Sequence, residues 1–221
     1  MKLYTAVGIR IEHRDGSFCV NVADGEKRLL GLEKIIWIGL VGNFIKEENI
    51  FVYIQNVVDE ISNTHIPLPE KDVSYCLQRL ITRGLVIGES GNDEQSIVYK
   101  MLSKAIVIPI RYSLVDRIAG FCVALLQGKG IRFASQIFRY QTVDKKKKQF
   151  VKMLDKSGDV QRYVKLIQDR DLLEEYGIHN LLKNFDQEKF LAEIQKLYHQ
   201  RLIIIHKIGE SEYEKAKTTY Q

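Results

Sequence analysis

The segment from Pro69 to Pro109 constrains the fold of this chain most, because its hydrophobic spacing changes at Gly84. Before that glycine, apolar residues recur three and four positions apart, a spacing that predicts a helix with one buried stripe. The stripe consists of Val73, Leu77, Leu80 and Ile81. Gly84 stands where a helix ends on a residue that tolerates left-handed backbone angles. We therefore expect a helix over Glu70–Arg83 that leads directly into a strand.

Two short apolar runs follow that helix. Leu85–Gly88 and Ile97–Leu102 are separated by a polar, turn-rich stretch, and short apolar runs bounded by turn residues predict strands. We therefore expect a hairpin directly behind the helix. This order is that of a winged helix-turn-helix, in which the helix enters the major groove of DNA and the hairpin forms the wing.

The start of the chain predicts a three-strand meander. Apolar and polar residues alternate over Val7–Ile11 and again over Phe18–Val22, which is the period of a half-buried strand. Asp15-Gly16 and Asp24-Gly25 supply the turns between strands. Lys27–Leu32 is then expected as the third strand.

Two helices are expected between the meander and the helix at Glu70. The apolar residues around Trp37 predict a first helix from Glu33 to about Lys46. Asn49 can cap the second, and prolines at positions 67 and 69 stop it. The first half of the chain therefore predicts strands, three helices and a hairpin.

Pro109 marks the expected boundary between a domain at 1–109 and a second at 110–221. Beyond it we expect mainly helices over 112–201, including an apolar stripe from Leu114 to Leu126 suited to a homodimer interface. Asp186 is expected to cap the last helix, and Leu202–His206 predicts a strand. This helix-to-strand order repeats that of the first half, so the second half is either another winged-helix unit or a helical extension. The fold class is therefore α+β.

Composition permits an anionic partner without requiring one. The formal net charge is +5, from 33 lysine and arginine residues against 28 aspartate and glutamate residues. The three cysteines lack zinc-finger or redox-motif spacing, which favours a reducing, cytoplasmic compartment. We see no secretion signal, and the longest uncharged stretches are too short to cross a bilayer.

The polar face of the helix at Glu70–Arg83 is the candidate DNA-binding site. Arginine and glutamine suit bidentate contacts with bases, and the other polar types suit phosphate contacts. The candidate residues are Lys71, Ser74, Tyr75, Gln78, Arg79 and Arg83. The alternative is a solvated helix face, and the acidic residues Glu89, Asp93 and Glu94 at the expected wing tip count against phosphate binding there.

Catalysis and cofactor binding are not expected. The five histidines do not form a metal motif, and the chain has neither a Gly-rich phosphate loop nor a Gly-x-Ser-x-Gly frame. We therefore predict no catalytic residue, no metal site and no cofactor. The lysine run at 145–148 favours a solvated helix start over a phosphate contact.

The chain resembles two families. The pattern Val73-Ser74-x-x-Leu77-x-x-Leu80-x-x-x-Gly84-Leu85-Val86, with Tyr99 and Leu102 behind it, resembles the winged-helix domains of PadR and MarR bacterial transcriptional regulators. This likeness covers about Glu33 to Leu102 and implies a sequence-specific transcriptional regulator that binds double-stranded DNA, which is the function that the sequence favours. Those regulators do not usually begin with a three-strand meander, and their wings are usually more basic.

The first ninety or so residues also resemble the PqqD-like peptide-binding domains, through Leu30-Gly31-Leu32 before Glu33–Trp37. Those domains place a three-strand sheet before a helical trio and take a peptide on the sheet edge. That likeness implies a protein-interaction module that binds an extended peptide by strand addition. A structural winged-helix protein within a larger replication or chromosome-maintenance complex is a third interpretation.

Overall fold

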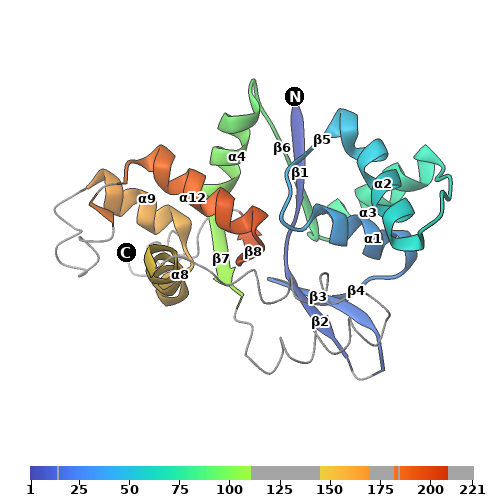
Figure 1. The fold of residues 1–221 in the computed structure, drawn as a ribbon, viewed down its shortest axis with the longest axis horizontal. Helices are drawn as coiled ribbons and strands as arrows, with labels where there is room; N and C mark the ends of the chain where they lie inside the picture. The colour runs from blue at the N-terminus through green and yellow to red at the C-terminus, as the bar shows by residue number, and fades with distance from the viewer. Residues whose placement is uncertain (14, 111–144, 170–181, 184, 209–221) are drawn as a thin grey trace, which may run out of the picture.

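The computed structural model describes residues 1–13, 15–110, 145–169, 182–183 and 185–208. Within them the chain combines helices with three small antiparallel sheets, which confirms the predicted α+β class. Figure 1 shows β1 (Lys2–Ala6) near the middle of the molecule, with α1, α2 and α3 on one side and α4, α9 and α12 on the other. No helix in the described part of the chain has the length and apolar character needed to cross a membrane.

The predicted meander is present, with a shorter third strand. β2 (Ile9–Glu12), β3 (Phe18–Val22) and β4 (Gly25–Arg28) form one sheet in that order. The turns at Asp15-Gly16 and Asp24-Gly25 lie where they were expected. The third strand ends at Arg28 because the first helix already begins at Gly31.

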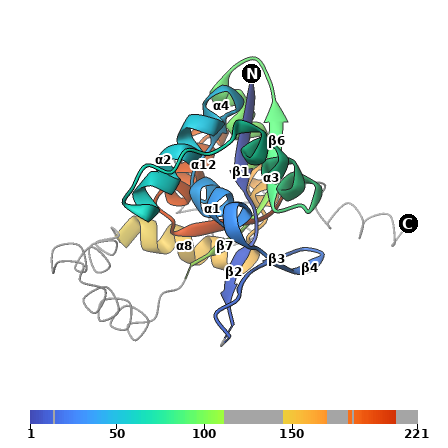
Figure 2. The ribbon, with the colours of Figure 1, turned by 90° about the vertical axis from the view of Figure 1, so that its right-hand side faces the viewer.

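The three expected helices follow this sheet, but the first ends at Leu40, short of the expected end near Lys46. They are α1 (Gly31–Leu40), α2 (Ile50–Ser62, preceded by the 3-10 turn η1 at Glu47–Asn49) and α3 (Glu70–Thr82). Asn49 precedes α2 as predicted, but its side chain makes no capping hydrogen bond. The Trp37 side chain ties α1 to the segment between β1 and β2, since its indole donates to the carbonyl of Val7 at 3.0 Å. Figure 2 shows α1 next to the β2–β3–β4 sheet.

Gly84 ends α3 as predicted, with φ of 68°, and β6 (Val86–Ser90) follows. The partner of β6 is not a returning strand. β6 pairs antiparallel with β1, Ala6 lying opposite Val86, and the two-residue strand β5 (Ile45–Lys46) pairs with the other edge of β1.

The prediction of a strand at Ile97–Leu102 is wrong, because these residues belong to α4 (Glu94–Leu102). The Asp93 side chain caps this helix by accepting a hydrogen bond from the Ser96 amide at 2.8 Å. The apolar residues Ile97, Val98, Met101 and Leu102 are all buried, and their spacing forms a helical stripe as readily as a strand. The N-terminal strand β1 occupies the sheet position that the expected hairpin would have filled.

The described C-terminal residues are mainly helical, as predicted. They form α8 (Lys145–Ser157), α9 (Val160–Gln168) and α12 (Gln187–His199). Asp186 caps α12 as expected, accepting from the Lys189 amide at 2.8 Å. The predicted strand is β8 (Ile203–Ile208), which pairs antiparallel with β7 (Ala105–Pro109). The expected apolar stripe at 114–126 lies outside the described residues.

Two hydrophobic cores lie on either side of β1. One joins the inward faces of α1, α2 and α3 to the meander, and includes Ile36, Leu40, Ile54 and Leu80. The other joins α4, α8, α9 and α12 to the β7–β8 pair, and includes Leu3 from β1 itself. β1 therefore contributes to both cores, with Tyr4 and Ala6 in the first and Leu3 in the second.

Candidate functional site

The outward face of α3 is polar and accessible, as predicted. Val73, Leu77 and Leu80 are buried, which turns the polar residues of the helix away from the core. Five of the six candidate DNA-binding residues are exposed: Lys71, Ser74, Tyr75, Gln78 and Arg79. The sixth, Arg83, is half-buried at the end of the helix.

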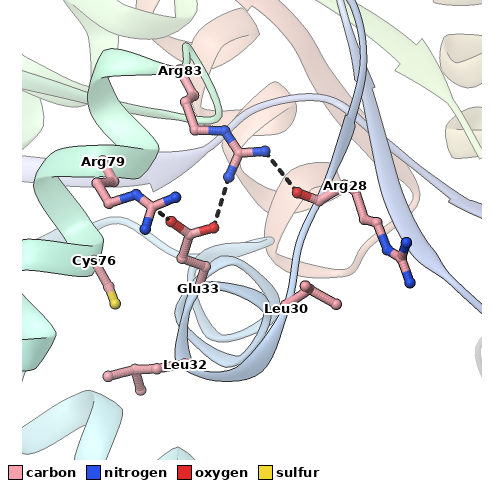
Figure 3. A pocket seen from close by; sticks show the side chains of 7 residues that line it. All are labelled: Arg28, Leu30, Leu32, Glu33, Cys76, Arg79 and Arg83. Atoms are coloured by element: carbon pink, nitrogen blue, oxygen red, sulfur yellow. Dashed lines mark hydrogen bonds and ion pairs between the residues drawn. The ribbon is translucent and has the colours of Figure 1, made fainter.

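A buried carboxylate from α1 engages the two arginines of this face. Glu33 is 8% exposed, and its Oε2 accepts a hydrogen bond from a terminal guanidinium nitrogen of Arg83 at 2.7 Å. Arg79 Nε lies 3.0 Å from Glu33 Oε1, an ion-pair distance without hydrogen-bond geometry. Figure 3 shows both guanidinium groups directed at this carboxylate. Glu33 therefore anchors α3 to α1 and draws both arginines toward the protein.

Arg83 also links α3 to the edge of the meander. Its second terminal nitrogen donates to the carbonyl of Arg28 on β4 at 2.6 Å. Lys27 on the same strand donates to the carbonyl of Arg83 at 2.8 Å. These two hydrogen bonds hold the end of α3 beside β4, so strand and helix form the two walls of one depression.

That depression is a pocket of about 340 Å³. Figure 3 shows charged and apolar side chains that reach it from β4, from the start of α1 and from α3. The lining residues are Arg28, Leu30, Leu32, Glu33, Cys76, Arg79 and Arg83. Leu30 is 63% exposed, so its side chain is accessible at the pocket.

A second, shallower hollow of about 250 Å³ adjoins the first along α3. Tyr75, Gln78 and Thr82 line it together with the two arginines. The Tyr75 ring is 64% exposed, and the Arg79 guanidinium lies 5.8 Å from its centroid, within the range of a cation–π contact. Arg79 and Arg83 line both hollows, so the candidate site continues from the meander across α3.

Cys76 contributes a thiol to the larger pocket. Burial raises the pKa of this thiol, and the nearby Glu33 carboxylate raises it further. A thiol with a raised pKa stays protonated at neutral pH and is a poor nucleophile. Cys76 therefore serves this pocket as a small apolar surface.

The edge of β4 beside the pocket is open within the described residues, where β4 pairs with β3 alone. The amide of Leu29 donates to the carbonyl of Phe18 on β3. The backbone N–H and C=O groups of Leu29, and of Lys27 two positions earlier, therefore face β3. Because these directions alternate along a strand, the backbone groups of Glu26 and Arg28 point outward. The accessible edge is therefore short and runs into the pocket.

The acidic residues expected at a wing tip have other roles. Asp93 caps α4, Glu94 pairs with Lys46 on β5 at 3.1 Å, and Glu89 accepts from Lys100 on α4. These contacts occupy the carboxylates within the protein. The prediction of an acidic wing tip is therefore wrong, because residues 94–102 form a helix rather than the second strand of a wing. The acidic residues there no longer count against phosphate binding by a wing.

No pattern in the sequence indicated Glu33 or the pocket beside it. Glu33 stands in the first turn of α1, where an acidic residue is ordinary for electrostatic reasons, and nothing in its spacing connects it with residues 79 and 83. The lysine run at 145–148 does begin a helix, as favoured. No protein-family model, curated protein or solved structure matches this chain.

Proposed function

We propose that this protein is a binding module that takes an extended peptide segment along the open edge of β4, with one side chain in the pocket between β4 and α3. The observation that carries the proposal is that Arg28, on the open edge of β4, also lines a pocket with apolar and cationic walls. The resemblance to PqqD-like domains, which take a peptide on a sheet edge after three strands and before three helices, supports the same conclusion.

Backbone pairing supplies the first part of this recognition. An added strand gains main-chain hydrogen bonds without regard to sequence, and adjacent pockets then select side chains. Here the Arg28 carbonyl on the edge already accepts from Arg83. We expect an incoming peptide amide to donate to the Arg28 carbonyl in place of Arg83. The terminal nitrogen of Arg83 that this frees can bind the peptide, while the other terminal nitrogen keeps its hydrogen bond to Glu33.

The pocket supplies selectivity. Its lining carries three arginines, Arg28, Arg79 and Arg83, and a single carboxylate, Glu33, which leaves an excess of positive charge. Leu30 and Leu32 provide an apolar floor beside these charges. The preferred ligand is therefore a segment in which an apolar side chain is flanked by acidic residues, since guanidinium groups bind carboxylates in pairs of hydrogen bonds.

Selection from a random peptide library on the full-length chain tests this proposal. We expect the selected peptides to share an apolar residue next to Asp or Glu. Fluorescence polarisation with one selected peptide should show affinity at least about tenfold weaker for Leu30→Ser and for Arg28→Glu, from lost apolar contact and reversed charge. Val52→Ser on α2 is the matched control, because Val52 is 60% exposed and distant in sequence from the pocket.

Two outcomes contradict the peptide proposal. Selected peptides with no common acidic or apolar preference would leave the pocket without a role. Equal binding of one peptide to Leu30→Ser, Arg28→Glu and the parent would place the binding site elsewhere on the protein.

A second candidate, favoured by the exposed polar face of α3, is a sequence-specific regulator that binds double-stranded DNA. Lys71, Ser74, Tyr75 and Gln78 lie on this face without obstruction from the sheet edge. Arg79 and Arg83 would have to leave Glu33 to reach a base or a phosphate. This requirement is why we place DNA binding second.

An electrophoretic shift assay with random-sequence duplex at two salt concentrations tests the second candidate. Lys71→Ala should weaken all duplexes alike and reduce the salt slope by about one, whereas Arg79→Ala should cost about 1–3 kcal/mol and relax sequence preference. Lys196→Ala on α12 is the control, since that lysine is also well exposed. Identical binding by the Lys71 and Arg79 variants and the parent would remove α3 as the DNA reader.

We propose a cytoplasmic location for this binding protein and no catalytic activity. Cys19 and Cys76 are both free thiols in the described structure. A homodimer through the apolar stripe at 114–126 remains a prediction.

A further inference from the structure

Three potential metal ligands converge on the meander, two from its strands and one from the residue that follows β2. Cys19 lies on β3, His13 directly follows β2, and Glu26 lies on β4. Their donor atoms, a sulfur, a ring nitrogen and a carboxylate oxygen, all lie within 4.8 Å of one another. This cluster is separate from the α3 pocket, whose lining includes none of the three residues.

Strand register explains the convergence. Ile11 on β2 lies opposite Cys19, and Asn21 lies opposite Glu26 on β4. Residues two apart on a strand share a face, so His13 and Glu26 are both diagonal neighbours of Cys19 on one face of the sheet. The opposite face carries Phe18 and Val20, which belong to the hydrophobic core.

We propose that His13, Cys19 and Glu26 bind one divalent metal ion of the borderline-soft class, with Zn²⁺ as the best match. Cysteine sulfur, histidine nitrogen and carboxylate oxygen are the three donors that Zn²⁺ takes in proteins. A thiolate in the set disfavours Mg²⁺ and Ca²⁺, which prefer oxygen ligands alone. Three protein ligands leave the fourth tetrahedral position open to water or to a group on a partner.

The cluster needs only side-chain movement to accept the ion. His13 Nε2 and Glu26 Oε1 are 2.5 Å apart, whereas two ligands of a tetrahedral Zn²⁺ ion stand about 3.4 Å apart. The His13 and Glu26 side chains are 43% and 40% exposed, so both can turn outward without disturbing the core. Cys19 is buried at 5% exposure and fixes the third position.

An exposed histidine–carboxylate pair is not by itself a metal site, and the same chain provides the comparison. His65 Nδ1 lies 2.8 Å from Asp59 Oδ2 at the end of α2, and His65 is also well exposed. The described residues place no third donor of this kind at that pair, whereas the thiol of Cys19 completes the cluster on the meander. The His65–Asp59 pair therefore serves as the matched control.

A bound ion would join all three strands of the meander. It would tie the edge strand β4 to β2 across β3, in addition to the backbone ladder. Metal binding to the folded state alone stabilises that state by mass action. The metal site stands independently of the proposed peptide or DNA function.

Titration of the full-length reduced chain with Co²⁺, followed by Zn²⁺ displacement, tests the proposal. We expect one Co²⁺ per chain, with a thiolate-to-cobalt absorption band that Zn²⁺ removes. Cys19→Ser should abolish the band, and Cys76→Ser should retain it. A parent protein without the band, or a Cys19→Ser variant that keeps it, overturns the proposal.

Single ligand variants provide a second readout that does not depend on the thiol. Competition against a zinc-binding dye should show Zn²⁺ affinity more than about 100-fold weaker for His13→Gln and for Glu26→Gln, since loss even of an outer partner costs about 10–100-fold. His65→Gln should bind as the parent does. Circular dichroism checks that each variant is folded, and parent-like affinity in folded His13→Gln and Glu26→Gln contradicts the assignment.

Discussion

α3 and α12 are the same local structure in two different surroundings. Each helix has 13 residues and ends on a residue with positive φ, Gly84 at 68° and Arg201 at 54°. The closing hydrogen bonds also match, since Leu85 donates to the Leu80 carbonyl and Leu202 to the Leu197 carbonyl, both at 2.9 Å. Each helix then leads into a strand, β6 or β8, whose antiparallel partner, β1 or β7, comes earlier in the chain.

The two helices differ in what covers them. α3 buries three residues and leaves its polar face exposed, whereas α12 buries five, including Phe190 and Tyr198. The Tyr198 hydroxyl lies 2.7 Å from Thr5 Oγ1 and donates to the Ala6 carbonyl at 3.1 Å, which joins α12 to β1. The sequence of helix, left-handed residue and strand therefore determines the local geometry. Packing determines whether the helix has an exposed face or is part of a core.

The largest expected difference between the helices concerns deletion of an aromatic ring. Tyr198→Ala should lower the free energy of unfolding by about 3–5 kcal/mol, because it leaves a cavity beside β1 and removes two buried hydrogen bonds. Tyr75→Ala on α3 should change it by less than about 0.5 kcal/mol, because that ring is 64% exposed. Urea denaturation measures both, and similar losses for the two variants would refute the distinction.

Alkaline pH provides a second test. Complete burial raises the pKa of Tyr198 to about 12, from the 10.0 of a tyrosine side chain in water. The folded state therefore holds the hydroxyl proton of Tyr198 more tightly than the unfolded state does. The contribution of this group to the free energy of unfolding is fully present below pH 10 and is lost as the pH rises through about 12. The loss corresponds to roughly 2–3 kcal/mol for two pKa units.

Comparison with Tyr198→Phe isolates this tyrosine from the others. Burial also raises the pKa of Tyr4, Tyr53 and Tyr163, so the parent should lose stability from several groups in the same direction. The difference in the free energy of unfolding between the parent and Tyr198→Phe should become smaller between pH 10 and 12. A difference that stays constant over this range would contradict a buried, neutral Tyr198.

The anchor between α1 and α3 offers a smaller effect. Glu33→Gln should cost about 1–2 kcal/mol, less than a fully buried ion pair, because the Arg79 side chain is 53% exposed. Glu193→Gln on α12 is the matched control, since its partner Lys196 lies at 3.5 Å and is 66% exposed. We expect that change to stay within about 0.5 kcal/mol in the same denaturation assay, and equal costs would remove the special role of Glu33.

The smallest effects concern the two helix ends. Gly84→Ala should destabilise by about 1 kcal/mol, because the position has space for a methyl group but a left-handed backbone. Arg201→Gly should stabilise by up to about 1 kcal/mol, because it relieves the same strain at the end of α12. Arg201→Ala separates loss of the side chain from relief of the backbone. Changes of equal sign for Gly84→Ala and Arg201→Gly would show that the two ends are not equivalent.

Local patterns in the sequence determined several elements of this protein. The stripe of Val73, Leu77 and Leu80 specified α3 and its outward face, and Gly84 specified where the helix ends. The turns at Asp15-Gly16 and Asp24-Gly25 specified the meander, because these dipeptides adopt tight turns without help from distant residues. Such features depend on residues within a few positions of one another.

Only the tertiary structure decided which segments meet. Ile97–Leu102 lies in a helix, and β1, more than eighty residues earlier, fills the sheet position beside β6. Glu33 reached Arg79 and Arg83 through the packing of α1 on α3, and His13, Cys19 and Glu26 met through strand register. These contacts join residues that are far apart in the chain at irregular intervals, so no local pattern predicts them. The spacing of apolar residues determines which segments form helices and strands, and the packing of their apolar faces against one another determines which of them are neighbours.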